Sequence, residues 1–237
     1  AYAQSVAVRK LSGQLLGQLK KLERKPDRNA MFSIGIKVEG NPTPLAYYRE
    51  EELEERVTCS SCAMEYTIYG AFGFCPDCGI HNSLQIVNAN FDLVLRTLDL
   101  AQAAPEELSG KLIENALEDA VSSFDGFGRE HCKSQPWKIS FQSIDAAREK
   151  ILREIGIDIS SKLDSDVWKL VAKQFQKRHL LAHKLGVVDS EYLLKTGEPQ
   201  SQLGRKVAIT DSDVRELVVH LRAVAAALYH GVPREAA

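Results

Sequence analysis

The chain of 237 residues is long enough for one large or two small domains, and its 44% apolar and 26% charged residues are ordinary for a soluble globular protein. The formal net charge of -2 excludes a global positive field that would draw the whole protein to nucleic acid, so any such binding must be local. No run of 18 apolar residues occurs, which excludes a membrane-spanning segment and a membrane partner.

The N-terminal residues and the cysteine pattern indicate the compartment. The first residues, Ala1-Tyr2-Ala3-Gln4, contain no apolar signal core. Four of the five cysteines fall in two Cys-x-x-Cys pairs, which is a metal-binding pattern of reducing compartments and not a disulfide framework. We therefore expect a cytoplasmic protein.

Two elements are predicted before the cysteines. Leucine and valine recur at steps of three and four over residues 4–24, which predicts an amphipathic helix. Apolar residues alternate with other residues over 31–39, which predicts a strand.

Residues 57–82 are predicted to form a zinc ribbon. Cys59 and Cys62 make the first Cys-x-x-Cys pair, and Cys75 and Cys78 make the second, with twelve residues between the two pairs. Two such pairs at the ends of a β-hairpin place four thiolates at the corners of a tetrahedron, the geometry of structural Zn²⁺. We expect one structural zinc ion without a catalytic role, because four cysteine ligands leave no open position. A redox dithiol would need only one pair and a thioredoxin-like βαβ context, which is missing.

The aromatic residues of the ribbon allow two interpretations. Tyr66, Tyr69, Phe72 and Phe74 lie between the cysteine pairs. Exposed aromatic rings on a hairpin can stack on bases, while a domain too small for its own core also uses aromatic rings to cover the metal.

The chain is predicted to become helical after the ribbon. Residues 82–103 form a helix capped by Asn82, with one apolar stripe, that links the ribbon to a helical domain. The predicted organisation is residues 1–82 with an N-terminal helix, short strands and the ribbon, a linking helix over residues 83–105, and a helical domain over residues 106–237.

Within this domain the strongest helical pattern covers residues 108–124, and a loop containing glycine and proline is predicted over residues 125–142. Further helices are predicted over residues 143–156, with Ser143 as the cap, and over residues 210–231, where Thr210 opens a sequence that resembles a capping box. The last helix is apolar enough to be a candidate dimer face.

Arg178, His179 and His183 stand near the end of a helix predicted over residues 166–185. With 3.6 residues per turn, His179 and His183 share one face, whereas Arg178 and His183 lie about 140° apart around the axis. Gly186 marks the helix end, where the helix dipole favours a protonated His183. Arg178 and His183 can share one phosphate if the helix ends there or if a two-fold partner supplies a second copy of the helix.

The sequence Arg-His-Leu-Leu-Ala-His at residues 178–183, followed by Gly-Val-Val-Asp at 186–189, Tyr-Leu at 192–193 and Thr-Gly at 196–197, resembles the HEPN superfamily of all-helical RNases and nucleotide-binding domains. The resemblance covers roughly residues 106–231. It implies that Arg178 is the motif arginine, His179 its polar neighbour and His183 the motif histidine. The expected fold is therefore mainly α, with a C-terminal HEPN-like helical bundle and a small N-terminal zinc-ribbon module that contains β-strands.

Lysine residues make the same predicted helix basic. Residues 165–185 contain five Lys or Arg residues and one Asp. Lys169, Lys173, Lys177 and Lys184 follow one another at steps of four, four and seven, which predicts a basic strip on its polar face. Such a strip can hold an RNA backbone, or can simply solvate the helix.

The resemblance implies an endoribonuclease that needs no metal ion for catalysis. RNA is cut in this way by its own 2'-hydroxyl group, with a proton acceptor, a proton donor and a cation at the phosphate. His183 would transfer the proton, Arg178 would stabilise the charge on the phosphate, and His179 would orient or assist. The expected products carry a 2',3'-cyclic phosphate and a 5'-hydroxyl group. The resemblance further implies a homodimer with the site at its interface, and a toxin or antiviral-defence effector restrained by an inhibitor or antitoxin protein.

Two other classes of protein fit the same residues. The helical domain can be a non-catalytic scaffold that binds RNA or nucleotides through the motif residues. Alternatively, the ribbon can be the working part of a nucleic-acid-binding adaptor with a dimerising helical domain.

Overall fold

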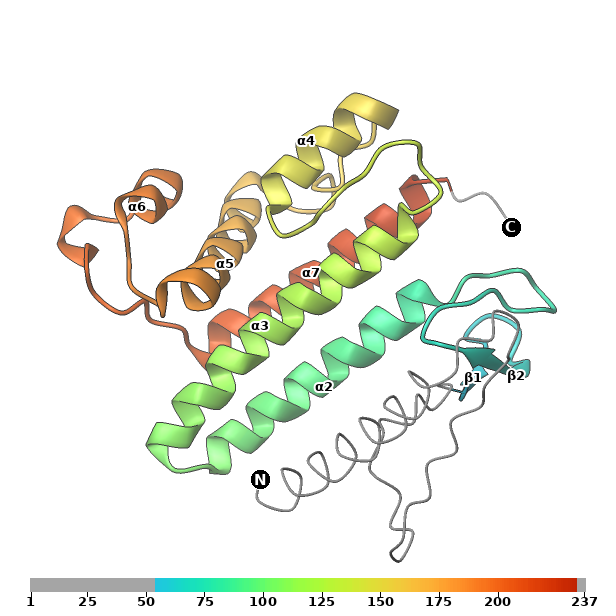
Figure 1. Cartoon of the computed structure of the whole chain (residues 1–237), viewed down its shortest axis with the longest axis horizontal. Coiled ribbons are helices and arrows are strands. Elements are labelled where there is room, and N and C mark those ends of the chain that lie inside the picture. The colour runs from blue at the N-terminus through green and yellow to red at the C-terminus, as the bar shows by residue number, and fades with distance from the viewer. Residues whose placement is uncertain (1–53, 234–237) are drawn as a thin grey trace, which may run out of the picture. The chain divides into compact units, whose positions relative to one another are not determined.

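The computed structural model describes residues 54–233, and this part of the chain is mainly helical with a small antiparallel sheet (Figure 1). The predicted mainly helical fold with a small N-terminal module that contains β-strands is thus confirmed. The helix predicted over residues 4–24 and the strand predicted over 31–39 lie outside the described residues. The elements are β1 (Glu54–Thr58), β2 (Glu65–Tyr69), α2 (Ser83–Ala103), α3 (Glu106–His131), α4 (Ile144–Ile155), α5 (Ser165–Lys184), α6 (Ser190–Thr196), a 3-10 turn (Gln200–Gln202) and α7 (Asp211–Gly231).

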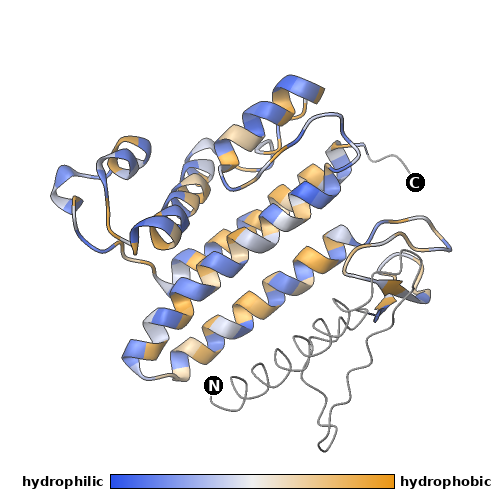
Figure 2. Cartoon of the chain, viewed as in Figure 1, coloured by the Kyte–Doolittle hydropathy of each residue, from blue (hydrophilic) through white to orange (hydrophobic). Residues whose placement is uncertain are grey.

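The long helices α2, α3 and α7 contact one another and form the centre of the bundle (Figure 1). Hydrophobic residues recur along each of them between hydrophilic ones (Figure 2). Phe91 and Leu98 of α2, Phe124 of α3 and Leu221 of α7 are fully buried in one apolar cluster. Helix α2, which we predicted to link the ribbon to the helical domain, also contributes its apolar stripe to the main core.

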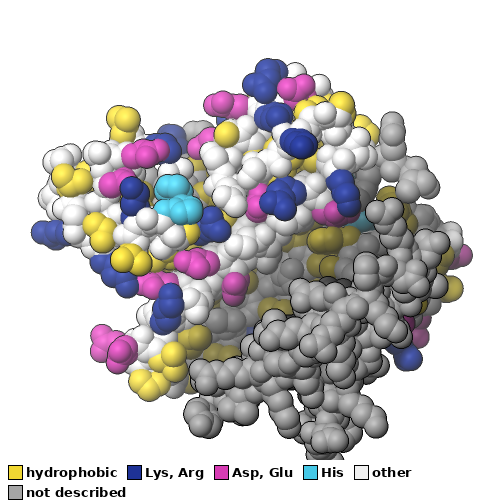
Figure 3. Space-filling model, viewed as in Figure 1, with side chains coloured by type: hydrophobic (Ala, Val, Ile, Leu, Met, Phe, Trp, Pro, Cys, Tyr) yellow, Lys and Arg dark blue, Asp and Glu magenta, His cyan; other side chains and the backbone are white. Residues whose placement is uncertain are grey.

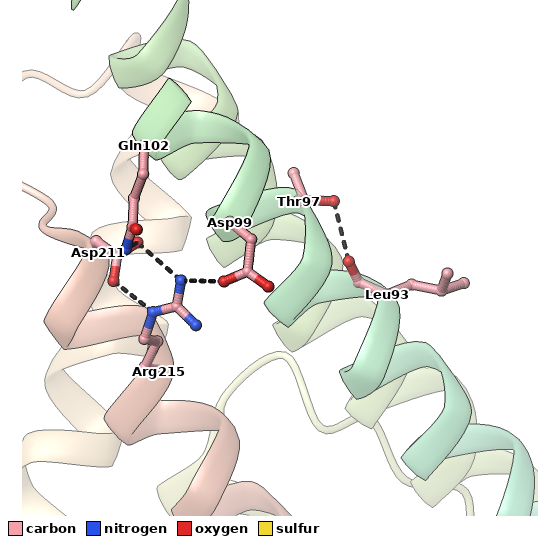
Figure 4. Close-up of polar contacts among 6 residues, drawn as sticks. All are labelled: Leu93, Thr97, Asp99, Gln102, Asp211 and Arg215. Carbon is pink, nitrogen blue, oxygen red and sulfur yellow. Dashed lines mark hydrogen bonds and ion pairs between the residues drawn. The ribbon is translucent and has the colours of Figure 1, made fainter. Parts of the chain in front are cut away.

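Two arginine residues of α7 add polar contacts to α2. Arg215 lies 2.7 Å from Asp99 and 2.5 Å from Asp211. Figure 4 shows both contacts. Arg222, two turns later, lies 2.7 Å from Asp92. Ion pairs at such exposed positions contribute about 0–1 kcal/mol each, so we assign them to the alignment of the two helices more than to stability.

Helix α3 continues to His131, and the prediction of a loop from residue 125 is wrong in this part. Phe127 and His131 are buried and extend the apolar stripe of the helix by two turns. Gly128 lies against the ring of Phe141, which is itself fully buried. A glycine that usually weakens a helix is therefore tolerated here, because it lets an aromatic ring approach the helix backbone.

The two glycine residues at the end of α3 should respond oppositely to the same substitution. A Cβ atom at Gly128 would lie 2.4 Å from the Phe141 ring, whereas one at Gly126 would have nothing within 4 Å. We expect Gly128→Ala to lower the free energy of unfolding by about 2 kcal/mol through overpacking. Gly126→Ala should raise it by up to about 1 kcal/mol through helix propensity. Urea unfolding measures both, and equal effects would show that Phe141 does not restrict Gly128.

The predicted helix ends are confirmed in part. Thr210 and Asp213 make the reciprocal hydrogen bonds of a capping box at α7, and Gly156 ends α4 in the left-handed conformation with a φ of 73°. Asn82 and Ser143 precede α2 and α4, but their side chains make no capping hydrogen bond. The start of α7 and the end of α4 thus follow from local sequence, whereas Asn82 and Ser143 do not cap the helices that they precede.

Helix α6 was not predicted. Val188, Tyr192 and Leu193 bury themselves against Leu180 of α5 and form a small second core. This packing places α6 beside the end of α5, where Arg178 and both histidines lie.

Candidate metal centre and histidine site

Two similar turns hold the predicted metal ligands. In each turn the N–H of the first cysteine donates to the carbonyl group five residues later, at 2.9 Å from Cys59 and 2.8 Å from Cys75. The carbonyl of that cysteine accepts from the N–H four residues later, which belongs to Ala63 in the first turn and Gly79 in the second. Both of these residues have positive φ, 60° and 70°. The first turn joins β1 to β2, and the second lies inside the bridge between residues 74 and 81.

The four cysteine sulfur atoms of Cys59, Cys62, Cys75 and Cys78 lie within 4.8 Å of one another. The Sγ atoms of Cys59 and Cys78 are 3.6 Å apart, as are those of Cys62 and Cys75. A tetrahedral site with metal–sulfur bonds of about 2.3 Å has edges of roughly 3.8 Å. The thiol set thus fits one four-coordinate metal ion, as predicted for these residues.

Backbone groups prepare the Cys59 sulfur for this role. The N–H groups of Cys62 and Ser61 donate to it and lower the pKa of the Cys59 thiol to about 6. A thiolate is the form that binds metals, so this environment favours the ligand. Several thiolates at such short distances repel one another, and a bound cation would offset that repulsion.

The ribbon is fastened to the start of α2 by side-chain amide groups. The side-chain amide of Asn82 accepts a 2.9 Å hydrogen bond from the Gly73 N–H and donates a 3.0 Å bond to the Ala71 carbonyl. Gln85 donates to the carbonyl of Thr58 at 2.9 Å. The Asn82 side chain therefore holds the segment before the second turn against the start of α2, in place of the capping role that we predicted for it.

The aromatic residues of the ribbon do not share one role. Phe72 and Phe74 lie 6.2 and 4.7 Å from the ring of His81, which is buried, and the Tyr229 hydroxyl of α7 donates to the His81 carbonyl at 3.0 Å. Both phenylalanines thus belong to the junction between ribbon and bundle. Tyr69 is 71% exposed and remains available for stacking.

The end of α5 carries two exposed imidazole groups. The rings of His179 and His183 have centroids 4.8 Å apart. The helix stays regular to Lys184, and the N–H groups of Leu185 and Gly186 both donate to the Leu180 carbonyl. The tightly closed helix end keeps the two rings together at the rim of the bundle.

Arg178 lies on a different side of α5 from His183. The regular helix keeps the two residues about 140° apart around the axis. Arg178 is partly buried, and its Nε atom is buried without a hydrogen-bond partner among the described residues. The structure of one chain therefore brings His179 and His183 together but leaves Arg178 apart.

Helix α6 adds a carboxylate that the sequence did not point to. Lys195 bonds to Glu191 at 2.7 Å and holds the pKa of that carboxyl group below its usual value, with a smaller contribution from His179. Glu191 thus belongs to a helix that packs beside the end of α5, and it was missed because α6 itself was missed.

The four predicted RNA-binding lysines do not form one strip. Lys177 is buried, 2.9 Å from Asp213 at the start of α7, so its prediction as an exposed strip residue is wrong. The four lysines lie within about 80° of one another around α5, so helical periodicity does not separate them. Lys177 lies at the edge of that arc and is covered by α7. Lys169, Lys173 and Lys184 remain at the surface or partly so. Figure 3 shows basic and acidic side chains interspersed on one face of the bundle, with histidine side chains exposed among them.

Comparisons of the chain with models of protein families, with curated proteins and with solved structures gave no match. None of the helices within residues 54–233 combines the length and apolar character needed to cross a bilayer.

Proposed function

We propose that this chain is an endoribonuclease whose chemistry uses side chains and no metal ion. The observation that carries the proposal is the pair of exposed imidazole groups of His179 and His183, with centroids 4.8 Å apart at the end of α5. Imidazole is the side chain best suited to exchange protons near neutral pH. The HEPN-like motif that spans these residues supports the same reaction.

The proposed reaction is an internal transesterification of RNA. One imidazole accepts the proton of the 2'-hydroxyl group, and the 2'-oxygen forms a bond to phosphorus. The bond between phosphorus and the 5'-oxygen breaks, and a protonated imidazole gives its proton to that oxygen. The products are a 2',3'-cyclic phosphate and a 5'-hydroxyl group. His183 takes the main proton-transfer role, and His179 assists or orients it.

Arg178 supplies positive charge to the phosphate in this proposal. Because Arg178 and His183 lie on different sides of one α5, we propose that a second copy of the chain brings its own α5 to the site. The phosphate then lies between Arg178 of one copy and His183 of the other, and the arginine stabilises the charge that builds on its oxygens. The protein is thus proposed to be a homodimer.

We propose zinc as the metal of the cysteine cluster. Four thiolates in a tetrahedron are typical of structural Zn²⁺, and they leave no position for a substrate or water. The ion would hold the two turns of the ribbon and take no part in the reaction. By resemblance, the proposed setting is a cytoplasmic toxin or antiviral-defence effector restrained by an inhibitor or antitoxin protein.

A non-catalytic RNA-binding scaffold is the second candidate. It is favoured by one feature, namely that the regular helix α5 places Arg178 and His183 about 140° apart around its axis. A scaffold needs only that RNA contacts either residue, whereas catalysis needs both at one phosphate.

Incubation of the purified protein with labelled single-stranded RNA and tRNA tests the nuclease. We expect cleavage to persist in EDTA, provided that the bound metal is shown to be retained, because no step uses a metal ion. Mass spectrometry of the fragments should find cyclic phosphates. Fragments with 3'-hydroxyl and 5'-phosphate ends would contradict the mechanism, and RNA binding without cleavage would favour the scaffold.

A further inference from the structure

A groove of about 700 Å³ lies between α4, α5 and α6. Its volume is within the range of about 300–1,000 Å³ that is common for small-ligand sites. Lys173 of α5 and Lys195 of α6 stand on one side, and Asp145 and Glu149 of α4 stand on the other. A ligand for this groove therefore needs an anionic group at one end and hydrogen-bond donors at the other.

The groove continues toward the histidine pair. Ala172 and Gln176 line it, and His179 and His183 follow them on α5 at steps of three and four residues. Residues at these steps share one helix face. At a rise of 1.5 Å per residue, Gln176 and His179 are about 4.5 Å apart along the axis. A ligand in the groove would thus reach the neighbourhood of the imidazole groups.

The lysine side of the groove can exchange its present partners for a phosphate. Lys195 bonds to Glu191 of its own helix at 2.7 Å, and Lys173 is paired with Glu198. The exposed pair of Lys195 and Glu191 contributes little to stability, so its replacement costs little. The pair of Lys173 and Glu198 is partly buried and costs more to replace. A phosphate that bridges both ammonium groups gains two charge-assisted hydrogen bonds.

The carboxylate side is partly fixed in place. The indole N–H of Trp168 donates to Asp145 at 2.7 Å, which holds that carboxylate at the edge of the groove. Glu149 is exposed and makes no ion pair with any residue in the described part of the chain. Ala146 of α4 and Leu170 of α5 also line the groove and give it apolar surface. This arrangement suits a flat ring that carries N–H donors.

We propose that the groove binds one nucleotide of the RNA next to the cleaved phosphate, and that it prefers guanine. The phosphate lies on the lysine side, and the base directs its N–H groups to the carboxylates. Guanine presents two adjacent donors, N1–H and the 2-amino group, which match the two oxygens of a carboxylate such as Glu149. This inference rests on the proposed nuclease function, and it adds a base preference to it.

Binding of short RNAs to the His183→Ala protein tests the groove without interference from cleavage. Four labelled pentanucleotides, UUGUU, UUAUU, UUCUU and UUUUU, are compared by fluorescence anisotropy at several salt concentrations. We expect the guanine-containing RNA to bind about tenfold more tightly than UUUUU, as for one good bidentate contact. Introducing Glu149→Gln into the His183→Ala protein should remove that preference and leave the binding of UUUUU unchanged.

Substitutions on the lysine side should act on all four RNAs alike. Lys173→Gln and Lys195→Gln should each weaken binding several-fold. Each should also reduce the slope of the logarithm of the binding constant against the logarithm of the salt concentration by about 0.7. Lys162→Gln is the matched control, because Lys162 is exposed and lies outside the groove. It removes the same charge and should leave the affinities unchanged.

The outcomes separate this inference from the nuclease proposal. Failure of the His183→Ala protein to bind any of the RNAs overturns the groove assignment. A guanine preference that survives Glu149→Gln also overturns the assignment. So do RNA affinities that Lys173→Gln and Lys195→Gln leave unchanged, which is the result expected if the groove binds a peptide. Cleavage by the wild type together with any of these three results leaves the nuclease proposal standing. Groove-dependent binding without wild-type cleavage contradicts the nuclease and keeps the nucleotide site.

Discussion

His183→Ala and Arg178→Ala should each slow RNA cleavage by a factor on the order of 10² to 10⁴. The first substitution removes the proposed proton-transfer group, and the second removes the charge that stabilises the phosphate. Single-turnover rates with saturating protein isolate the chemical step from RNA binding. His230→Ala is the control, because it removes an exposed imidazole from the far end of α7. Wild-type rates in both site variants would contradict the proposed roles.

A mixture of the two inactive variants tests whether the site is shared between copies. If Arg178 of one chain acts with His183 of the other, a mixed dimer keeps one intact site. An equal mixture of the variants should then recover about a quarter of the wild-type activity after subunit exchange. If both residues act within one chain, neither site of a mixed dimer is intact and no activity returns. Recovery therefore supports the arrangement inferred from the separation of Arg178 and His183 around α5.

Cys75→Ser should abolish metal binding and unfold the ribbon. A serine hydroxyl group is a poor replacement for a thiolate, and three thiolates leave a site for a fourth ligand open. Structural zinc contributes on the order of 10 kcal/mol to the folding of small zinc domains, which have little apolar core of their own. Metal analysis should find the loss of one equivalent per chain, and hydrogen exchange should accelerate over residues 54–82.

The helical bundle should survive this change. Its main apolar cluster consists of residues from position 87 onward and includes none from the ribbon. Cys132→Ser is the control, because Cys132 is buried in that cluster and lies outside the group of four thiols. It should lower the unfolding temperature while one equivalent of metal is retained. A Cys75→Ser protein that keeps its metal would show that the four thiols do not form the site.

Local patterns were sufficient to predict the cluster of four cysteines and most helices. A Cys-x-x-Cys pair forms its turn from backbone hydrogen bonds within six residues, as the turns at Cys59 and Cys75 do. The capping box of Thr210 and Asp213 likewise needs only one helical turn. The close approach of His179 and His183 follows from their four-residue step. In each case the interacting atoms are near neighbours in the chain, so the sequence alone determined these features.

Only the tertiary structure decided which faces of the helices are covered and which side chains meet across them. Gly128 stays in α3 because Phe141 packs on it, and Lys177 is buried because Asp213 of α7 lies opposite. The groove brings Glu149 of α4 and Lys195 of α6 together from positions that share no local pattern. Helical periodicity defines the face of one helix, but the packing partner of that face depends on long-range contacts. Those contacts are selected by the burial of apolar surface over the whole bundle.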